Sequence, residues 1–587
     1  MTSPQAAPFD ARNASLNKLG VIQRCVNFMR LEKRQIPLAI LLAAVAFLVL
    51  YPIGAIVFLT FMPAEMPDVF GTMSWDRAFA EPGIKQSILN TLYVVGATQA
   101  IGLPIAVLIA WCLGRTDVPG RHAFEFCFWI MFFLPSLGVL TGWLLMFDPD
   151  FGLVNQWLKD MGWARVSPFN LYSFWGIVFI HLVTHSIAVK VMLLTPAFRN
   201  LDNAIEEASR VCGATTFKTI FRIVLPILTP ALLVVLLMSI IRGLETFEVE
   251  LVLGTPIRFQ VYSNKIYQLM VNNPPEFRAA GMLGTSILAM VLPLIVFQRW
   301  MSTRRSYVVL TGRSSTAPVR LGRWRWPVFV LLLTFTMFIS LLPFVLLLAG
   351  SFMRLFGFFN LAQVWTTNHW IKALGDVTFT SSFNNMLVLG LGTAALAVMI
   401  YALVAYAVVR IRSRLAAPLD WLSWLPLTIP GVVLGFGYLN MALQVPLFAY
   451  FYGTVVALIL VSFLASMPLG VQVLKVQMLQ MGSDIEEAGR IVGGGWLKTF
   501  WRIVLPLSAP ALAIVGIMVF ASTIRAVSTV MLLSSGNNRV LSVLQVEFLS
   551  DGSMGPASVV GTVIVLISLV AAALVRLISL RFGVKTR

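Results

Sequence analysis

Residues 205–232 read I-E-E-A-S-R-V-C-G-A-T-T-F-K-T-I-F-R-I-V-L-P-I-L-T-P-A-L, and residues 485–512 read I-E-E-A-G-R-I-V-G-G-G-W-L-K-T-F-W-R-I-V-L-P-L-S-A-P-A-L. The second stretch follows the first at a spacing of 280 positions, and 16 of the 28 aligned residues are identical. A long match at one fixed spacing is typical of an internal repeat. We therefore interpret the chain as two equivalent halves.

The amino-acid composition places both halves in a membrane. Of the 587 residues, 58% are hydrophobic and only 12% are charged, and the mean hydropathy is +0.86. A soluble globule of this size needs more polar surface than these residues supply. The net charge of +18 does not indicate nucleic acid, because the Lys and Arg residues cluster beside the ends of apolar stretches, as the positive-inside rule describes.

Apolar stretches long enough to cross a bilayer, about 20 residues each, occur six times in each half. They are residues 37–62, 87–113, 124–147, 173–194, 226–244 and 279–298 in the first half, and residues 327–352, 382–409, 418–442, 450–474, 506–525 and 556–577 in the second. Both sets have the same orientation, so the repeat is parallel, about an axis along the membrane normal. The predicted fold class is an all-α polytopic membrane protein with twelve transmembrane helices as two parallel six-helix repeats.

Shorter similarities extend the repeat beyond the loop. The corresponding pairs are Asn90 with Gly96 and Asn384 with Gly390, and then Pro135 with Gly142 and Pro430 with Gly437. These pairs lie in the second and third spans of each half. The duplication is therefore expected to cover each half as a whole.

Charge divides the chain into five segments and predicts their orientation. The segments are an amino-terminal tail (1–36), a first six-span domain (37–298), a basic linker (299–326), a second six-span domain (327–577) and a carboxy-terminal tail (578–587). The linker carries seven arginines and no acidic residue, which predicts a cytoplasmic location. Arg115 and Arg121 predict the same side for the loop between the second and third spans. Both termini and both repeated loops are then expected in the cytoplasm.

Each repeated loop is predicted to form a helix, a glycine turn and a second helix. The sequence E-A-x-x-x-x-G is followed after nine residues by I-x-L-P. These residues are Glu207, Ala208, Gly213, Ile223, Leu225 and Pro226 in the first loop (205–226), and Glu487, Ala488, Gly493, Ile503, Leu505 and Pro506 in the second (485–506). The motif resembles the EAA loop of the inner-membrane permeases of binding-protein-dependent ABC importers. The resemblance covers nearly the whole chain as two permease domains.

The resemblance implies that each loop is a coupling helix that docks into a groove on a separate ATPase subunit. The residues implied in ATPase coupling are Glu206, Glu207, Ala208, Gly213, Glu486, Glu487, Ala488 and Gly493. The implied partners are two copies of an ATP-binding cassette ATPase, an external solute-binding protein and membrane lipid, with no nucleic acid and no cofactor. The implied location is the bacterial inner membrane. Because no G-x-x-x-x-G-K-[ST] sequence occurs, ATP hydrolysis is expected on the partner subunits, and the chain itself is not expected to be an enzyme.

Two stretches of the first half bear on the transported solute. Residues 244–256 read L-E-T-F-E-V-E-L-V-L-G-T-P, and residues 263–267 read S-N-K-I-Y. In a fused double permease of this length they look most like the ferric-iron group of these importers. Permeases for thiamine, spermidine/putrescine, sulfate and phosphonate share the general plan. Ferric iron is the first expectation, and these other solutes stay open as alternatives.

Two other classes of protein compete with this interpretation. A secondary carrier of the major-facilitator type also has twelve spans in two parallel halves, and Asp117, Gly120 and Arg121 resemble part of its signature. The corresponding loop of the second half, residues 410–418, lacks these residues, and a carrier has no reason to hold two long loops between its fourth and fifth spans. An intramembrane enzyme is disfavoured because no span pairs a nucleophile with a base or holds a set of metal ligands.

Ionisable residues beside the spans indicate a candidate translocation pathway, because such groups are costly at membrane depth unless they face a partner or water. At the spacing of 280 positions, Glu245 corresponds to Arg525 at the outer ends of the fifth and eleventh spans. This acid and base are predicted to meet as an outer gate, with Glu248 on the acidic side. The alternative is that they are solvated just beyond the bilayer. His181 and His185 are expected to form hydrogen bonds between helices or to face the pore, and no metal site is predicted.

Overall fold

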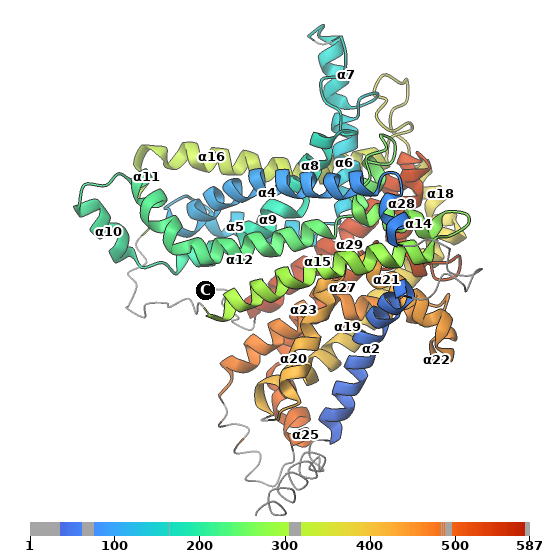
Figure 1. Cartoon of the computed structure of the whole chain (residues 1–587). Helices are drawn as coiled ribbons and strands as arrows, with labels where there is room; N and C mark the ends of the chain where they lie inside the picture. The colour runs from blue at the N-terminus through green and yellow to red at the C-terminus, as the bar shows by residue number, and fades with distance from the viewer. Residues whose placement is uncertain are drawn as a thin grey trace, which may run out of the picture.

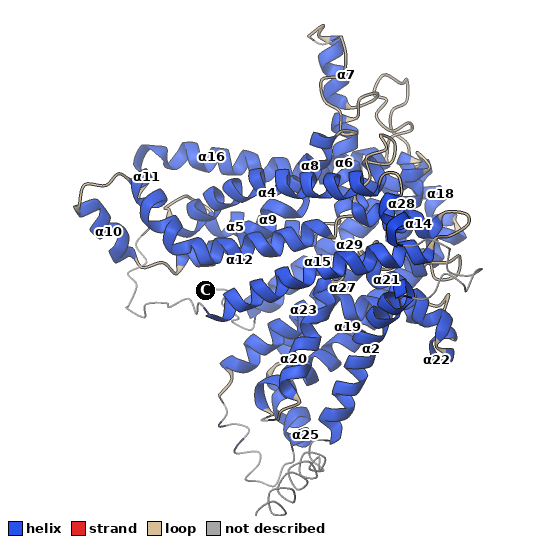
Figure 2. Ribbon diagram, in the orientation of Figure 1, coloured by secondary structure: helices blue, strands red, loops and turns tan. Residues whose placement is uncertain are grey.

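The computed structural model describes residues 36–61, 75–163, 165–304, 318–411, 413–482, 484, 487 and 496–581, and these residues are mostly helical (Figure 1; Figure 2). The first half contains α2 (Ile36–Phe61), α3 (Trp75–Ala80), α4 (Ile84–Arg115), α5 (Arg121–Phe133), α6 (Ser136–Phe147), α7 (Leu153–Asp160), α8 (Phe174–His181), η1 (Leu182–Ser186), α9 (Ile187–Arg199), α10 (Asn203–Val211), α11 (Thr216–Thr219), η2 (Ile220–Val224), α12 (Leu225–Leu244), α13 (Glu248–Leu253), α14 (Tyr262–Val271) and α15 (Phe277–Arg304). The second half contains η3 (Gly322–Trp324), α16 (Arg325–Thr336), η4 (Met337–Leu341), α17 (Leu342–Ser351), α18 (Asn368–Gly375), α19 (Val377–Arg410), α20 (Ala416–Trp424), η5 (Leu425–Thr428), α21 (Gly431–Gln444), α22 (Pro446–Ala449), α23 (Val455–Gln480), α25 (Trp496–Thr499), η6 (Phe500–Val504), α26 (Leu505–Leu507), α27 (Ala509–Ile524), η7 (Met531–Leu533), α28 (Leu541–Ser550) and α29 (Met554–Arg581). Most of the two predicted tails and the middle of the linker lie outside the described residues.

The long helices agree with the predicted fold class. Within the described residues, nine helices are long and apolar enough to cross a membrane, and three further pairs of helices qualify as bent spans, which gives up to twelve. Segments of about 20 apolar residues match the thickness of the hydrocarbon core. The chain is a multi-pass, all-α membrane protein.

The third span of each half differs from the single helix predicted for residues 124–147 and 418–442. α5 and α6 meet at 102° beside Pro135, and the helix that ends with η5 meets α21 at 110° beside Pro430. Proline lacks a backbone N–H, and it pushes the preceding residue out of the helical conformation. Each apolar stretch is long enough for one straight transmembrane helix, so a prediction based on length alone missed both bends. We call these two segments the broken third spans.

Each broken third span packs against the first span of the other half, since α6 contacts α17 and α21 contacts α2. Glycine permits the close approach on both sides. A Cβ atom at Gly142 would lie 2.1 Å from the carbonyl oxygen of Pro343, and a Cβ atom at Gly437 would lie 2.9 Å from the Cβ of Pro52. The Pro and Gly pairs that recur in the sequence therefore mark a crossed packing of the two halves.

The recurring asparagine of the second spans is displaced by one residue from its predicted position. In α4, Asn90 donates a hydrogen bond to the carbonyl oxygen of Gln260 at 2.9 Å. The residue of α19 that makes the equivalent contact is Asn385, which donates to the carbonyl oxygen of Arg539 at 3.0 Å. Asn384 and Asn385 are adjacent in the sequence, and only packing decides which of the two faces the loop.

The end of the linker is held against the loop that follows α4. The backbone N–H of Val319 donates to the carbonyl oxygen of Arg115 at 2.7 Å, and the N–H of Asp117 donates back to the carbonyl oxygen of Val319 at 3.2 Å. The side chain of Asp117 accepts a hydrogen bond from the N–H of Leu321 at 2.9 Å. Asp117, which resembles part of a carrier signature, thus has a structural role here.

An arginine of each sixth span contacts the start of the other half's broken third span. Arg299 of α15 binds Asp420 of α20, with 2.5 Å between Nη2 and Oδ2. Its Cζ also lies 4.0 Å from the centroid of the Trp421 ring. Arg576 of α29 lies over Phe126 of α5, with 5.2 Å between Cζ and the ring centroid. These contacts join the two halves near the starts of α5 and α20.

Candidate coupling loops and a polar cluster at the first broken span

The first repeated loop contains the predicted helix, glycine turn and second helix. α10 ends in a turn in which the N–H of Ala214 donates to the carbonyl oxygen of Ser209 at 3.0 Å. Gly213 in this turn has a φ of 80°, the left-handed conformation that glycine adopts at low cost. No atom lies within 4 Å of a Cβ built on Gly213, so the backbone angle, rather than space, favours glycine. The chain then continues through α11 and η2 into α12.

The two neighbouring acids of α10 point in different directions. Glu206 is buried, and its Oε1 accepts a hydrogen bond from Nε of Arg115 at 3.0 Å. The two side chains also form an ion pair, with 2.8 Å between Nη2 and Oε1. Arg115 also donates through Nη1 to the carbonyl oxygen of Leu201 at 2.9 Å. Glu207 is exposed. Glu206 therefore fixes α10 to the end of α4, and Glu207 is the acid available to another molecule.

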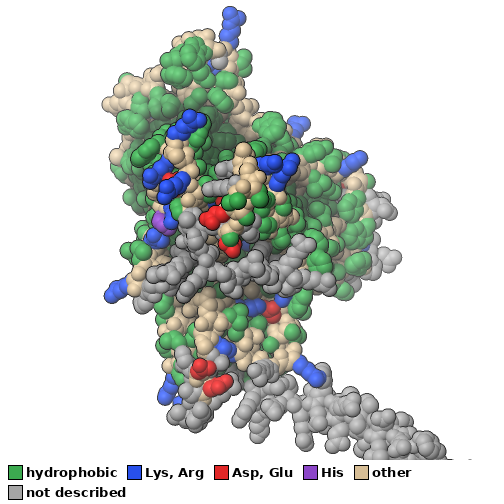
Figure 3. Space-filling model, turned by 90° about the vertical axis from the view of Figure 1, so that its left-hand side faces the viewer, with side chains coloured by type: hydrophobic (Ala, Val, Ile, Leu, Met, Phe, Trp, Pro, Cys, Tyr) green, Lys and Arg blue, Asp and Glu red, His purple; other side chains and the backbone are tan. Residues whose placement is uncertain are grey.

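The exposed side of the first loop combines apolar side chains with charged ones, among them Lys218 and Arg222. Glu207 and Ala208 are exposed, and Val211 is 88% exposed. On the next helical segment, Phe217 and Phe221 are exposed with ring centroids 4.5 Å apart. Figure 3 shows the face that lies on the left in Figure 1, where hydrophobic and basic side chains occur together. A large exposed apolar group at the end of a membrane protein is typical of a surface that another protein covers.

The second repeated loop is described only in part. Asp484 and Glu487 are helical and exposed, whereas Glu486, Ala488 and Gly493 lie outside the described residues. The described end of this loop, α25 followed by η6, matches α11 followed by η2. In Figure 1, α10 and α25 stand well apart, at the left and at the bottom.

Arg410, the last residue of α19, makes the contact that corresponds to that of Arg115. It donates through Nη2 to the carbonyl oxygens of Met478, at 2.8 Å, and Met481. From the sequence, Arg115 indicates only the orientation of a loop, and Arg410 has no predicted role. The available signal was an arginine that ends the second span of each half.

Glu245 and Arg525 do not meet as predicted. Glu245 binds Arg242, one helical turn earlier, with 3.0 Å between Nη1 and Oε2. This neighbour is near in the sequence, so the pair forms without any contact between the halves. The acid that reaches the first broken third span, which Arg525 also contacts, is Glu248. Glu248 begins α13 and accepts a hydrogen bond from the hydroxyl of Ser136 at 2.5 Å.

Arg525 follows α27 and contacts the first broken third span. Its Nη1 donates to the carbonyl oxygens of Phe132 and, at 3.4 Å, of Leu134. The same nitrogen lies 3.2 Å from Nε2 of His185. A residue of the second half therefore holds the bend of the first half. We call Arg525, Glu248, Glu250, His181 and His185 the polar cluster.

The two histidines of the fourth span make the expected contacts between helices. Nε2 of His181 lies 2.7 Å from Oε1 of Glu250 in α13, and His185 contacts Arg525. Among the described residues, no group of three or more His, Cys, Asp or Glu side chains is placed to hold a metal ion. The contacts with Glu250 and Arg525 make both histidines hydrogen-bonding groups.

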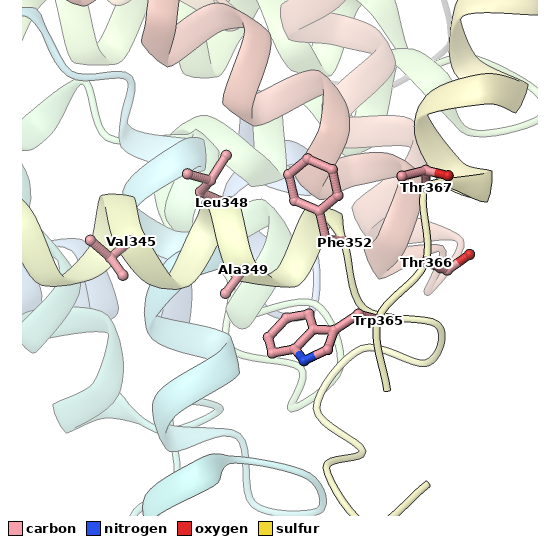
Figure 4. A pocket seen from close by; sticks show the side chains of 7 residues that line it. All are labelled: Val345, Leu348, Ala349, Phe352, Trp365, Thr366 and Thr367. Atoms are coloured by element: carbon pink, nitrogen blue, oxygen red, sulfur yellow. The ribbon is translucent and has the colours of Figure 1, made fainter. Parts of the chain in front are cut away.

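A separate pocket of about 740 Å³ lies at the end of α17. Figure 4 shows its lining side chains, which are Val345, Leu348, Ala349, Phe352, Trp365, Thr366 and Thr367. None of these residues carries a charge, and none belongs to the polar cluster. The pocket is therefore a poor candidate for a hydrophilic solute.

Comparisons with known proteins point to one family. The family described as binding-protein-dependent transport system inner membrane component matches residues 102–306 and residues 400–584. The chain is 26% identical over 533 residues to the ferric transport system permease protein FbpB of Actinobacillus pleuropneumoniae, which covers 89% of this chain and 74% of that protein. It is 27% identical over 496 residues to the putative ferric transport system permease protein FbpB 1 of Haemophilus influenzae, covering 84% and 77%. The crystal structure of a bacterial ABC transporter involved in the import of the acidic polysaccharide alginate matches 50% of this chain and 97% of that chain, at 21% identity and a TM-score of 0.35.

Proposed function

Because the chain belongs to the family of inner-membrane components of binding-protein-dependent transport systems, we propose that it forms the whole membrane part of an ABC importer. The single observation behind this proposal is that one chain carries two family matches, each with its own repeated loop. The assembly then holds one copy of this chain, two ATPase subunits and one external solute-binding protein. The family match also replaces the secondary-carrier interpretation.

The proposed arrangement places the permease domains at residues 37–298 and 327–577. The basic linker (299–326), the two tails and both repeated loops lie in the cytoplasm in this proposal, because arginine and lysine gather beside them. The end of the linker is held to the loop after α4, which keeps it on the same side as the first repeated loop.

The repeated loops are proposed to couple the membrane part to the ATPase subunits. Glu207, Ala208 and the apolar side chains beside them supply the docking face of the first loop, and Gly213 sets its turn. Glu206 acts differently, as a positioning residue that binds Arg115 and fixes α10. By the repeat, Glu486, Glu487, Ala488 and Gly493 supply the second loop.

The stoichiometry of the purified complex tests the proposed architecture. Native mass measurement of the complex extracted with its ATPase should show one copy of this chain and two ATPase copies. Two copies of this chain in each complex would overturn the proposal, since one chain would then supply only one membrane half.

Ferric iron is the proposed solute. Two relatives that cover most of this chain are named as ferric transport permeases, and the polar cluster offers acids rather than a wholly basic lining. Uptake into proteoliposomes should be measured with iron and, separately, with thiamine, spermidine, putrescine, sulfate and phosphonate, each with a matching binding protein. Uptake dependent on ATP should occur with iron, and uptake of another solute alone would replace iron as the assignment.

Glu245, Glu248 and Arg525 are proposed to line the translocation pathway. Glu245 bound to Arg242 forms one side of it. The outer gate is then formed between Arg525 and Glu248, with the carbonyl groups of the broken third span beside them. Glutamine at Glu248 should lower uptake while leaving the amount of assembled complex unchanged.

A further inference from the structure

The bend after α5 leaves backbone carbonyl groups without helical donors. At the end of a helix the last four carbonyl oxygens have no intrahelical N–H partner, and at membrane depth such groups need another donor. Arg525 donates to two of them, on Phe132 and Leu134. The donor is charged, and it comes from the other half of the molecule.

Three acceptors contact the Arg525 guanidinium, which also lies over the ring of Phe132, with 5.3 Å between Cζ and the ring centroid. The two carbonyl oxygens and the Nε2 of His185 contact it, and the carboxylate of Glu248 is bound to Ser136, two residues beyond Leu134. Carbonyl and carboxylate oxygens are the ligands that hard cations prefer. The guanidinium therefore occupies a place that is electrostatically suited to a cation.

One further acid beside this place has an unsatisfied oxygen. Glu250 is 0% exposed, and its Oε1 contacts His181 at 2.7 Å. Its Oε2 is buried and has no hydrogen-bond partner. A buried carboxylate oxygen without a partner is costly, and such a group in a transport protein usually marks an ion or solute path.

The second half lacks this set of acceptors. Ser528 and Val530 stand where the first half has Glu248 and Glu250. Gly431 begins α21 as Ser136 begins α6, and a Cβ atom at Gly431 would lie 2.3 Å from the hydroxyl oxygen of Ser528. Neutral packing thus fills the second bend, and the charged acceptors belong to the first bend alone.

We propose that the carbonyl groups of Phe132 and Leu134, the ring of His185 and the carboxylate of Glu248 form a transit site for a cationic solute, which Arg525 fills as a tethered cation when no solute is present. The inference rests on the proposed importer function and narrows its solute to a cation. Broken helices at corresponding positions of two repeats are where transporters commonly build such sites. An anion such as sulfate or phosphonate is repelled by Glu248 and Glu250.

The ligands of this site predict a low affinity for a cation, as transport requires. Its oxygen ligands are backbone carbonyl groups and one carboxylate, which is itself bound to Ser136. A conducting site must release its ion as well as bind it. Arrival of the solute displaces the guanidinium, and departure of the solute lets it return. The acceptors are therefore compensated by positive charge in both states.

Binding of Tb³⁺, a hard trivalent probe, to the purified complex tests the site directly. In the unaltered chain Arg525 competes with the probe. In R525Q, the affinity measured from Tb³⁺ luminescence, with and without ATP, should rise by about tenfold or more, since a unit positive charge has left the site. Adding E248Q to R525Q should remove the gain. The matched control is R539Q, because Arg539 binds Glu547 and lies outside the acceptor set.

Equal Tb³⁺ affinity in R525Q and R539Q would overturn the transit site. R525K, which keeps the charge, should behave like the unaltered chain, and a gain in this variant would also contradict the proposal. The eluted particle size of each variant shows whether it has folded.

A second measurement applies even when R525Q does not fold. In E248Q, uptake of the cationic solute from its binding protein should fall about tenfold, whereas E547Q should transport normally. Stimulation of ATP hydrolysis by the binding protein should persist in E248Q. If the binding protein does not stimulate ATP hydrolysis by the unaltered complex, the importer function is contradicted. Normal uptake by E248Q would contradict the transit site alone.

Discussion

Arg299, which contacts α20, and Arg576, which contacts α5, occupy equivalent positions in the two halves, but the residues around them differ. At α20, Asp420 binds both Arg299 and Lys475, so this contact joins three helices. The ring of Trp421 adds a cation–π contact to Arg299. An ion pair that is hydrogen-bonded, half-buried and stacked on a ring is stronger than an exposed pair.

At α5, the acid that corresponds to Asp420 is already bound within its own half. Glu125 pairs with Arg199, and Arg576 lies over Phe126 at a longer distance of 5.2 Å. The difference shows that duplication preserved the helices without preserving the strength of the contacts between them. Of the two arginine contacts, the one at α20 is therefore the stronger, and the one at α5 is a cation–π contact alone.

The largest expected effect comes from the turns of the repeated loops, where the two halves are proposed to act alike. Valine at both Gly213 and Gly493 should lower uptake by more than tenfold while ATP hydrolysis and membrane insertion persist. A β-branched residue is strained at the positive φ of 80° found at Gly213, at a cost of roughly 1–3 kcal/mol. Uptake and hydrolysis are measured together in proteoliposomes.

Asparagine at the same two positions is the control, because it tolerates the left-handed conformation. The two single valine variants then compare the halves. Normal transport by the double valine variant would remove the coupling role from both loops.

The next effect concerns the crossed packing of the first spans. G142A should destabilise the protein by roughly 3 kcal/mol or more, because the new Cβ would meet a backbone carbonyl oxygen at 2.1 Å. G437A should cost roughly 1–2 kcal/mol, because its Cβ would meet Pro52 with a smaller overlap, at 2.9 Å from the Cβ and 3.0 Å from the carbonyl oxygen. Thermal unfolding of the purified variants measures both. G96A is the control, since nothing lies within 4 Å of its Cβ, and a larger loss in G437A than in G142A would contradict the geometry.

A smaller effect is expected where arginine fixes the repeated loops. R115M leaves Glu206 buried without its partner, which should loosen α10 by roughly 2 kcal/mol. Hydrogen exchange of residues 203–211 reports this change. R115M combined with E206Q should recover part of the protection, because the unpaired charge is then gone.

R410M sharpens the comparison of the two loops. If Glu486 binds Arg410 as Glu206 binds Arg115, the hydrogen-exchange rate of the second loop should rise in R410M as much as that of the first loop rises in R115M. An unchanged exchange rate in the second loop would show that the two loops are fixed by different contacts.

The smallest effects test the two contacts between the halves. R299A should cost about 1–2 kcal/mol of stability and R576A about 0.5 kcal/mol, following the usual range for cation–π contacts and partly buried ion pairs. Unfolding in a detergent series measures the difference. Equal losses in the two variants would show that the contacts are equivalent after all.

The sequence predicted the fold through two independent signals, hydrophobic stretches of membrane length and a repeated loop. Both signals lie in short continuous stretches of sequence, so they can be recognised without knowing how the helices pack. The bends at Pro135 and Pro430 were accessible in principle, because proline disfavours a helix interior. They were missed because the surrounding apolar stretch was long enough for one helix.

The pairing of Glu245 with Arg525 failed for a different reason. It assumed that residues related by the repeat meet each other, whereas Arg525 contacts carbonyl groups of the other half that lie more than 390 positions away in the sequence. That contact depends on how α27 lies against the bend after α5. Glu206 shows the same limit, since only the fold places Arg115 beside it and turns it inward.

The crossed packing also determines the delay between the synthesis of α2 and the synthesis of the helix against which it packs. The hydroxyl of Tyr438 in α21 donates to the carbonyl oxygen of Leu48 in α2, across 390 positions of the chain. At about 5–20 residues per second, α2 waits roughly 20–80 seconds in the membrane before its partner is made. During that interval its contact face is open to lipid or to an insertion factor, and the ribosome, rather than the helix itself, determines when the first span reaches its final neighbours.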